Sequence, residues 1–476
     1  MNYTPVIGLE VHVELKTKSK MFCSCKAEYF GDKPNTNTCP VCLGLPGALP
    51  VPNKTAIEWC VMIGLALNCK IPQFSKFDRK NYFYPDLPKG YQISQYDKPF
   101  CTNGYVILNE VKDLDSSVAS LPQNDKGKKI KIRRVHMEED TAKLVHQFGV
   151  QSSKFKVQSY TLIDFNRSGV PLVEIVTEPD FESAEEVVEY LKKLQQIVRY
   201  LGVSDADMEK GEMRLEPNIS LQATRNTKHE EKNVLPVTSH VLPPYKVEVK
   251  NINSFKFVEK AINYEIERQK DLLNNGKTPI QETRGWDEKK QITVLQRIKE
   301  EANDYRYFPE PDIPPIHWNE DQISIRQLAD QMPELPDKKL KRFINNYLLS
   351  YYDSEILTRE KALADYFETA VRHGAIHLIT PKQIANAIIN KKIDIEVVLP
   401  SELIQSIITS SQTIQIDEEE LKEAINKLLK ENQKAVVDYK AGKKGVLMFL
   451  VGQTMRKFPK NLDAKLVTEK IKKMLE

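Results

Sequence analysis

One short stretch near the N-terminus constrains the fold of this chain more than any other. Across residues 7–15 apolar residues alternate with other types, which predicts a β-strand with one buried face. The apolar face would consist of Ile7, Leu9, Val11, Val13 and Leu15. The opposite face would present Glu10, His12 and Glu14, and two carboxylates around an imidazole form a ligand set suited to Mg²⁺ or Mn²⁺. For this stretch alone, an ordinary solvated strand face is an equally good interpretation.

Four further segments repeat this alternation and add more charged side chains. They cover residues 129–140, 171–176, 213–221 and 246–250. Their polar residues are His136, Glu138, Glu139, Asp140, Glu174, Arg214, Glu216, Asn218, Ser220, Lys246, Glu248 and Lys250. Five such strands predict an antiparallel sheet whose concave face carries carboxylates, Lys and Arg, which favours a charged ligand. Carboxylates that hold Mg²⁺ and cations that neutralise phosphates are the groups that phosphoryl transfer requires.

Four of the seven cysteines crowd together near the N-terminus. Cys23 and Cys25 form one short-spaced pair, and Cys39 and Cys42 form a second after a turn-rich segment. Two thiolate pairs on tight turns are typical ligands of a tetrahedral structural Zn²⁺, so residues 23–42 are predicted to be an inserted zinc-binding segment. Four free thiols in a reducing compartment are the alternative.

The segment 79–95 is rich in aromatic and basic residues. It contains Lys80, Tyr82, Tyr84, Lys89 and Tyr91. Stacking surfaces beside phosphate partners suit a nucleotide or a tRNA 3′ end, and simple packing is the alternative. The sequence has no glycine-rich phosphate loop, no dinucleotide fingerprint and no Ser or Cys nucleophile in a recognisable motif. It therefore predicts nucleotide binding on the sheet and no amidase activity of its own.

Helix signals and proline-rich breaks predict the domain organisation. Helices are expected to open at Asn53, Ser183 and Ser254, the second of them ending at Gly202. A chain of 476 residues exceeds one core, and the proline-rich run 309–315 marks a boundary. We expect an α+β fold: an N-terminal domain over residues 1–312, an all-helical domain over 316–407 and a small helical tail over 408–476.

Positive and negative charges are nearly balanced over the whole chain, but basic residues are concentrated near the C-terminus. Lys and Arg number 69 against 66 Asp and Glu, so the net charge of +3 does not indicate a nucleic-acid binder. Basic residues dominate residues 440–473, however, and either a solvated helix face or a nucleic-acid contact would explain them. The basic residues singled out there are Lys443, Lys444, Arg456, Lys457 and Lys460. No apolar run of membrane-spanning length and no signal segment occurs, so we expect a cytoplasmic protein without membrane contact.

The chain resembles the B-subunit family of the aspartyl/glutamyl-tRNA amidotransferases across nearly its whole length. The stretches that carry the resemblance are residues 7–15, 77–95, 136–143, 164–180, 250–255, 304–312 and 439–455. Two departures are visible. Where many members have Arg-Cys-Asp-x-Asn, this chain has Arg214-Leu-Glu216-Pro-Asn218, and the tail is shortened at about residues 407–417.

The resemblance implies a fold, a reaction and partners. The N-terminal domain would be a cradle related to glutamine synthetase, and the tail would bind tRNA. The chain would be the kinase and transferase of a heterotrimer, a carbon–nitrogen ligase that uses ATP and Mg²⁺ to activate the side-chain carboxylate of Glu-tRNA(Gln) or Asp-tRNA(Asn). A separate amidase (glutaminase) subunit would supply ammonia from glutamine, and a small third subunit would brace the pair.

Site residues follow from the matching motifs. The resemblance implies Mg²⁺ binding and catalysis by Glu10, His12, Glu139 and Glu174, and a structural Zn²⁺ on Cys23, Cys25, Cys39 and Cys42. Charge and location favour phosphate or acyl-group binding by Lys80, Lys89, Arg214, Lys250 and Arg306. Two alternatives remain at this point: a ligase acting on a small free carboxylate, and a zinc-stabilised tRNA-binding scaffold without catalysis.

Overall fold

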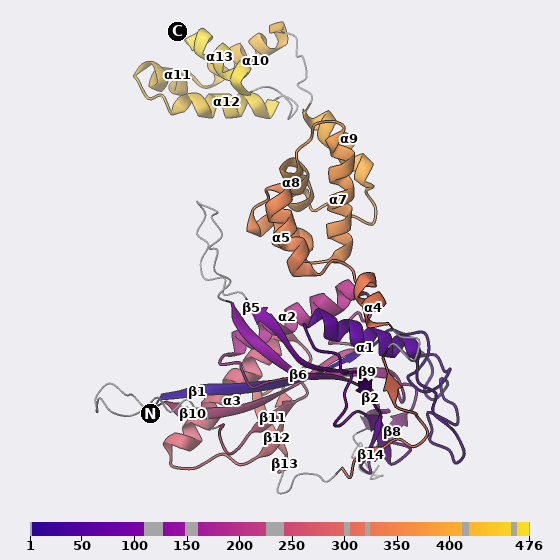
Figure 1. The fold of residues 1–476 in the computed structure, drawn as a ribbon. Helices are drawn as coiled ribbons and strands as arrows, with labels where there is room; N and C mark the ends of the chain where they lie inside the picture. The colour runs from indigo at the N-terminus through magenta and orange to yellow at the C-terminus, as the bar shows by residue number, and fades with distance from the viewer. Residues whose placement is uncertain are drawn as a thin grey trace, which may run out of the picture. The chain divides into compact units, whose positions relative to one another are not determined.

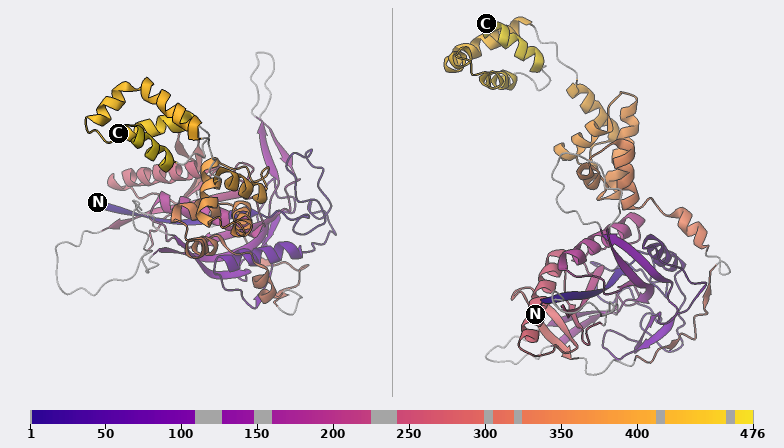
Figure 2. Two further views of the ribbon diagram at one scale, coloured as in Figure 1. Left: turned by 90° about the horizontal axis from the view of Figure 1, so that it is seen from above. Right: turned by 60° about the vertical axis from the view of Figure 1, so that its left-hand side comes forward.

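The computed structural model describes residues 2–108, 127–147, 160–224, 242–298, 305–318, 324–411, 418–457 and 464–475. Two compact units comprise Met1–Lys338 and Lys339–Glu476. The first unit combines a large sheet with helices, and the described residues of the second form helices and connecting loops without strands (Figures 1 and 2). A mixed α/β region followed by an all-helical region agrees with the expected fold class at this level.

An eight-stranded sheet organises the first unit. Its strands, in spatial order, are β13 (Ile292–Ile298), β12 (Glu282–Asp287), β11 (Val247–Lys250), β10 (Met213–Thr224), β1 (Asn2–Glu14), β9 (Pro171–Thr177), β6 (Lys128–Glu139) and β5 (Cys101–Leu108). All neighbours are antiparallel except β11 and β12, which are parallel. The five strands predicted from polar alternation are five consecutive neighbours, from β11 to β6.

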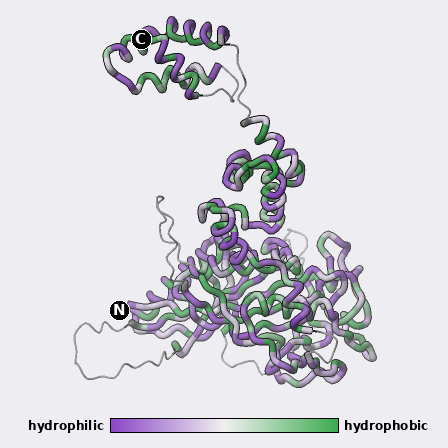
Figure 3. The backbone as a smooth tube through the Cα atoms, turned by 45° about the horizontal axis from the view of Figure 1, so that its top comes forward, coloured by the Kyte–Doolittle hydropathy of each residue, from purple (hydrophilic) through white to green (hydrophobic). Residues whose placement is uncertain are grey.

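Three helices cover the apolar face of this sheet. They are α1 (Lys54–Ala66), α2 (Ala184–Leu201) and α3 (Phe255–Asn274), and their apolar residues join the buried face of β1 in one hydrophobic core. The predicted caps are confirmed: the side chains of Asn53, Ser183 and Ser254 each accept a hydrogen bond from a first-turn amide. Gly202 ends α2 in the left-handed conformation, with φ of 73°. Hydrophobic and hydrophilic residues are interspersed along the described backbone (Figure 3).

Short strands among the described residues form three smaller sheets. β3 (Asp78–Asn81) lies between β14 (Phe308–Pro309) and β4 (Tyr91–Ser94), and β4 contacts β6. The remaining pairs are β2 (Phe74–Ser75) with β15 (Ile316–His317) and β7 (Lys143–Gln147) with β8 (Tyr160–Asp164). Helix α4 (Ile325–Gln331) contacts α1. The long-range β3–β14 pairing and the contact of β4 with β6 bring the aromatic and basic segment of residues 79–95 next to the polar strands.

The helical unit contains two hydrophobic cores. One is built by α5 (Pro336–Tyr347), α6 (Tyr351–Thr358), α7 (Lys361–Ala375), α8 (Pro381–Lys391) and α9 (Pro400–Ser411). The other is built by α10 (Glu418–Glu431), α11 (Gln433–Lys440), α12 (Val446–Lys457) and α13 (Ala464–Leu475). The three predicted domain ranges stay a prediction. Residues 304, 412–417 and 460, which the sequence analysis singled out, lie outside the described residues.

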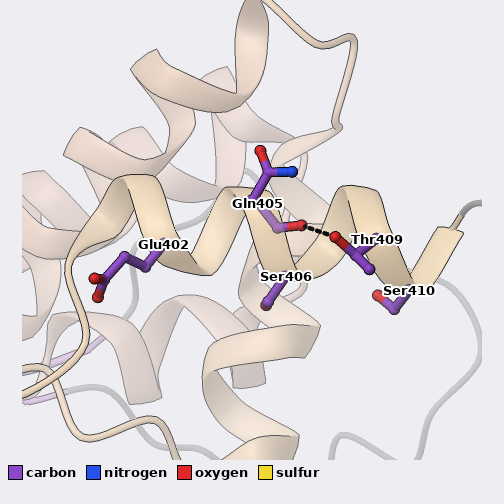
Figure 4. A pocket seen from close by; sticks show the side chains of 5 residues that line it. All are labelled: Glu402, Gln405, Ser406, Thr409 and Ser410. Atoms are coloured by element: carbon purple, nitrogen blue, oxygen red, sulfur yellow. Dashed lines mark hydrogen bonds between the residues drawn. The ribbon is translucent and has the colours of Figure 1, made fainter.

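A surface hollow lies along α9 (Figure 4). It is lined by Glu402, Gln405, Ser406, Thr409 and Ser410. The Thr409 hydroxyl donates to the Gln405 carbonyl at 2.9 Å, an ordinary contact within a helix. One carboxylate among hydroxyl and amide groups on a single helix face is no convergent ligand set, so we assign no chemistry to this hollow.

Candidate functional site

The register of the sheet gathers polar side chains from three adjacent strands. His12 of β1 lies opposite Glu174 of β9, and Glu174 lies opposite His136 of β6. Glu138 follows His136 by two positions, which directs both side chains to the same face. The pairing of β9 between β1 and β6 thus converts three separate sequence motifs into one site.

Glu174 lies at the centre of this group. Its Oε2 is 3.6 Å from His12 Nε2 and 3.2 Å from His136 Nε2. His136 Nε2 is also 3.5 Å from Glu138 Oε1. One ligand atom each from His12, Glu138 and Glu174 lies within 4.8 Å of the others. We name these three residues the central cluster; its two carboxylates are buried.

Charge interactions dominate the protonation of the central cluster. Burial alone would lower the pKa of His12, but the hydrogen bond and charge of Glu174 raise it to about 9. Burial alone would raise the pKa of Glu138, but the Lys80 ammonium and His136 lower it to about 2. Despite burial, His136 and His12 hold the pKa of Glu174 well below its ordinary value. At neutral pH without an ion, the carboxylates are therefore ionised and His12 is protonated.

A second group of carboxylates lies on the same face, toward β11. Glu10, Glu216 and Glu248 each place one oxygen within 4.8 Å of the others, and we name them the outer cluster. Lys250 Nζ is 2.9 Å from Glu216 and 3.4 Å from Glu248. Asn218 Nδ2 donates to Glu10 at 3.1 Å. Burial and the neighbouring Glu248 raise the pKa of Glu216. Lys250 thus pairs with both Glu216 and Glu248. Because one lysine charge faces more than one carboxylate, the outer cluster could also bind a cation.

The two lysines of the aromatic and basic segment contact different carboxylates. Lys80 Nζ lies 3.7 Å from Glu138 Oε1, at the edge of the central cluster. Lys89 Nζ pairs with Glu139 Oε1, and the same oxygen accepts the Ile93 amide at 2.9 Å. Strand β4 contacts both carboxylates, since Gln92 and Ser94 donate to Glu138 at 3.1 and 2.6 Å. The two neighbours differ in their cations: Glu138 joins the central cluster beside Lys80, whereas Glu139 is held by Lys89.

The remaining predicted phosphate ligands lie apart from one another. Arg214 lies opposite His12 on β10, and its guanidinium pairs with the buried carboxylate of Asp140. Burial and the nearby Asp140 charge raise the pKa of Glu14 well above its ordinary value. Arg306 is exposed, and its carbonyl accepts the Asn81 side-chain amide at 2.8 Å.

The four predicted zinc ligands come together. One ligand atom each from Cys23, Cys25, Cys39 and Cys42 lies within 4.8 Å of the others. The sulfurs of Cys39 and Cys42 are 3.8 Å apart, the separation of about 3.8 Å that a tetrahedral ion with Zn–S bonds of about 2.3 Å requires. The Cys39 amide donates to the Cys42 sulfur at 3.1 Å. A hydrogen bond from Cys23 is the main cause that lowers the pKa of Cys42 to about 5.

The structure regroups the predicted metal ligands. His12 and Glu174 come together, Glu10 lies in the outer cluster, and Glu139 lies beside Lys89. Glu138 was not in the predicted set, yet it completes the central cluster. Its spacing of two from His136 was the signal that could have found it, because both positions share one strand face.

Fold and site together define the class of protein. A mixed sheet presents two clusters of potential metal ligands and adjacent lysines on one face, and a separate tetrathiolate group lies near the N-terminus. Such groups suit an enzyme that acts on anionic substrates, and the clusters offer ligand atoms for a cation.

Comparison with known proteins identifies the family. The family model described as GatB/GatE catalytic domain matches residues 5–324, and the one described as GatB domain matches residues 333–475. The chain is 43% identical to the aspartyl/glutamyl-tRNA(Asn/Gln) amidotransferase B-subunit of Thermosipho melanesiensis, over 100% of both chains. The B-subunits of Thermotoga neapolitana, at 43%, and Persephonella marina, at 42%, match equally completely. The chain belongs to the B-subunit family of the aspartyl/glutamyl-tRNA(Asn/Gln) amidotransferases. No helix among its described residues is long and apolar enough to cross a membrane.

Proposed function

We propose that this chain is the kinase and transferase subunit of a tRNA-dependent amidotransferase. Its substrate is the side-chain carboxylate of Glu-tRNA(Gln), Asp-tRNA(Asn) or both. The carboxylate receives the γ-phosphoryl group of ATP, and ammonia then displaces phosphate to give Gln-tRNA(Gln) or Asn-tRNA(Asn). Family membership supports the overall reaction. The observation that supports placing the phosphoryl-transfer step on this sheet is the central cluster, whose ligand atoms could hold Mg²⁺.

The central cluster fits a divalent cation. Glu138 and Glu174 are buried and ionised, and His12 supplies a third ligand atom at matching distance. Buried carboxylates require a cationic partner, and in the absence of an ion the protonated His12 imidazole provides one. Bound Mg²⁺ would neutralise developing charge on a transferred phosphoryl group. Of the other predicted ligands, Glu10 remains a candidate through the outer cluster. Glu139 is paired with Lys89, so we propose for it a catalytic role beside the ion and only a small share in holding it.

The cations of the site suit the phosphates of ATP. Lys80 lies beside the central cluster and Lys250 beside the outer cluster, so a polyphosphate between them would meet an ammonium at each end. Lys89 and Arg214 already hold Glu139 and Asp140, and we propose that these two pairs keep the carboxylates in place around the substrate. For Arg306 only its exposure supports a substrate contact.

We further propose that the four cysteines hold a structural Zn²⁺. The Sγ separation of 3.8 Å and the amide donated to Cys42 are the supporting observations. Such an ion would fix the turns of residues 23–42 without entering the reaction. Backbone contacts such as Met21 N to Gly169 O, at 2.7 Å, join this region to the loop before β9.

The partners proposed are an amidase (glutaminase) subunit, a small third subunit and misacylated tRNA. A first domain of residues 1–312 would be the cradle related to glutamine synthetase, followed by helical domains over 316–407 and 408–476. The tail exposes Lys444 and Arg456 together with Phe449, which is 50% exposed. Cations beside an aromatic ring suit a nucleic-acid backbone and its bases.

The proposal is tested by ADP release from the purified heterotrimer with Mg²⁺ and Glu-tRNA(Gln), Asp-tRNA(Asn) or uncharged tRNA. We expect release only with a misacylated tRNA, and loss of release in Glu174→Gln. Glu182→Gln is the matched control, because Glu182 is exposed and pairs only loosely with Lys128 at 3.6 Å. Equal release with uncharged tRNA would favour a ligase for free carboxylates. No release from any mixture would favour the non-catalytic scaffold.

A further inference from the structure

Lys20 is a buried cation whose ammonium donates to backbone carbonyls. It is 0% exposed, and its Nζ donates to the carbonyls of Asn37 at 2.7 Å and Phe165 at 3.3 Å. Within the part of the chain that the structure describes, no carboxylate lies at ion-pair distance from it. A buried ammonium with neutral partners alone is strongly unfavourable, so its charge calls for a nearby negative group.

Lys20 lies against the turns that carry the four cysteines. The Lys20 amide donates to the Cys25 carbonyl at 2.9 Å, and Asn37 precedes Cys39 by two residues. A Cβ atom placed on Gly169 would lie 3.5 Å from both Cys42 Cβ and Lys20 Cδ. Lys20 and Cys42 therefore flank the same glycine, and the Lys20 ammonium reaches the turn that leads to Cys39.

Charge balance connects the buried Lys20 with the four cysteines. Zn²⁺ bound by four thiolates carries two net negative charges, and such a group in a buried setting needs compensation from its surroundings. We propose that Lys20 is the counter-charge of the tetrathiolate centre: it stabilises the metal-bound form and positions residues 37 and 165 around it. This inference rests on the zinc site of the proposed function and is independent of the phosphoryl-transfer step.

A counter-charge role explains why a lysine occupies a fully buried position. Four metal-bound thiolates place more negative charge beside the ammonium than the thiols of the metal-free site do, so the charge of Lys20 favours the bound state. The carbonyl of Phe165 belongs to the loop that leads to β9, which carries Glu174. Lys20 thereby links the cysteine turns to the strand at the centre of the candidate active site.

The test compares Lys20→Gln with Lys26→Met in the full-length chain. Glutamine keeps N–H donors for the two carbonyls and removes the charge. Lys26 lies in the same segment, but its ammonium is paired with Asp32 at 3.1 Å on the surface, which makes it a matched control. Zinc affinity is measured by competition with a chromophoric chelator, and thermal unfolding is followed for the metal-loaded and metal-free proteins.

We expect Lys20→Gln to lower zinc affinity about 10- to 100-fold, the usual effect of removing an outer-shell partner, with Lys26→Met unchanged within about twofold. The loaded protein should lose more thermal stability than the metal-free protein does. Unchanged affinity, or equal losses in both forms, would overturn the counter-charge role and leave the zinc site intact. A wild-type chain that takes up neither Zn²⁺ nor Co²⁺ would overturn the zinc site itself.

If Lys20→Gln fails to fold, Lys20→Arg keeps the charge and should retain wild-type zinc affinity. A loss of zinc affinity of about 10-fold in Lys20→Arg would count against the counter-charge role.

Discussion

Binding of Mg²⁺ to the central cluster should release a proton from His12. The pKa of His12 is raised from its ordinary 6.5 to about 9, chiefly because Glu174 outweighs the effect of burial. A protonated imidazole cannot coordinate a metal, so the ion must displace that proton. At pH 7 the pKa of His12 lies about 2 units above the solution pH. Removing the proton therefore costs about 2.7 kcal/mol and lowers the apparent Mg²⁺ affinity about 100-fold.

The pH dependence has a defined sign. Apparent Mg²⁺ affinity should rise about tenfold per unit from pH 7 to 9 and then level off. The metal-free protein should behave in the opposite way: stability from protonated His12 is fully present below pH 6.5 and is lost as pH rises through about 9. Above that range only the metal-bound form keeps the favourable pairing with Glu174.

Calorimetric Mg²⁺ titrations in two buffers of different ionisation enthalpy measure this release. At pH 7 we expect close to one proton per ion, and close to none in His12→Gln, whose affinity should vary little with pH. An affinity that stays constant from pH 6.5 to 9, with no proton released, would refute the assignment of His12 as a ligand.

Three further predictions concern neighbouring features. Glu138→Gln should weaken Mg²⁺ binding at least about tenfold, whereas Glu139→Gln, whose carboxylate is held by Lys89, should change it less than about threefold in the same titration. Removal of zinc by a strong chelator should expose residues 23–42 to proteolysis, seen as new cleavage products; an unchanged digest would contradict a structural ion. Leu191→Ala, at a fully buried position of α2, should lower the free energy of unfolding by about 2–5 kcal/mol in denaturant titrations, and a loss under about 1 kcal/mol would contradict the core packing.

Much of the sheet could be predicted from sequence because alternation reports directly on strand faces. The five polar segments are adjacent strands, and the caps at Asn53, Ser183 and Ser254 begin helices as expected. The parallel pairing of β11 with β12 and the short β3–β14 pair could not be predicted, because long-range pairing leaves no local periodicity.

The polar residues of the candidate site could be named from the sequence, but the predicted ligand set omitted Glu138, and the grouping of the residues could not be predicted. Alternation places Glu10 and His12 on one face, but only the register shows that His12 meets Glu174 while Glu10 meets Glu216. The different surroundings of Glu138 and Glu139 depend on the contact of β4 with β6, between segments far apart in sequence. Lys20 escaped notice because a lone lysine beside a cysteine motif is ordinarily a surface residue.

The central claim is that the side-chain carboxylate of the aminoacyl-tRNA receives a phosphoryl group before ammonia attacks. It is tested most directly by following one oxygen atom. Glu-tRNA(Gln) carrying ¹⁸O in both side-chain carboxylate oxygens is converted by the heterotrimer with ATP and glutamine, and the released phosphate is analysed by mass spectrometry. We predict one ¹⁸O atom in each phosphate released per Gln-tRNA formed, because the carboxylate oxygen leaves with the phosphoryl group. Formation of Gln-tRNA with unlabelled phosphate would contradict the mechanism.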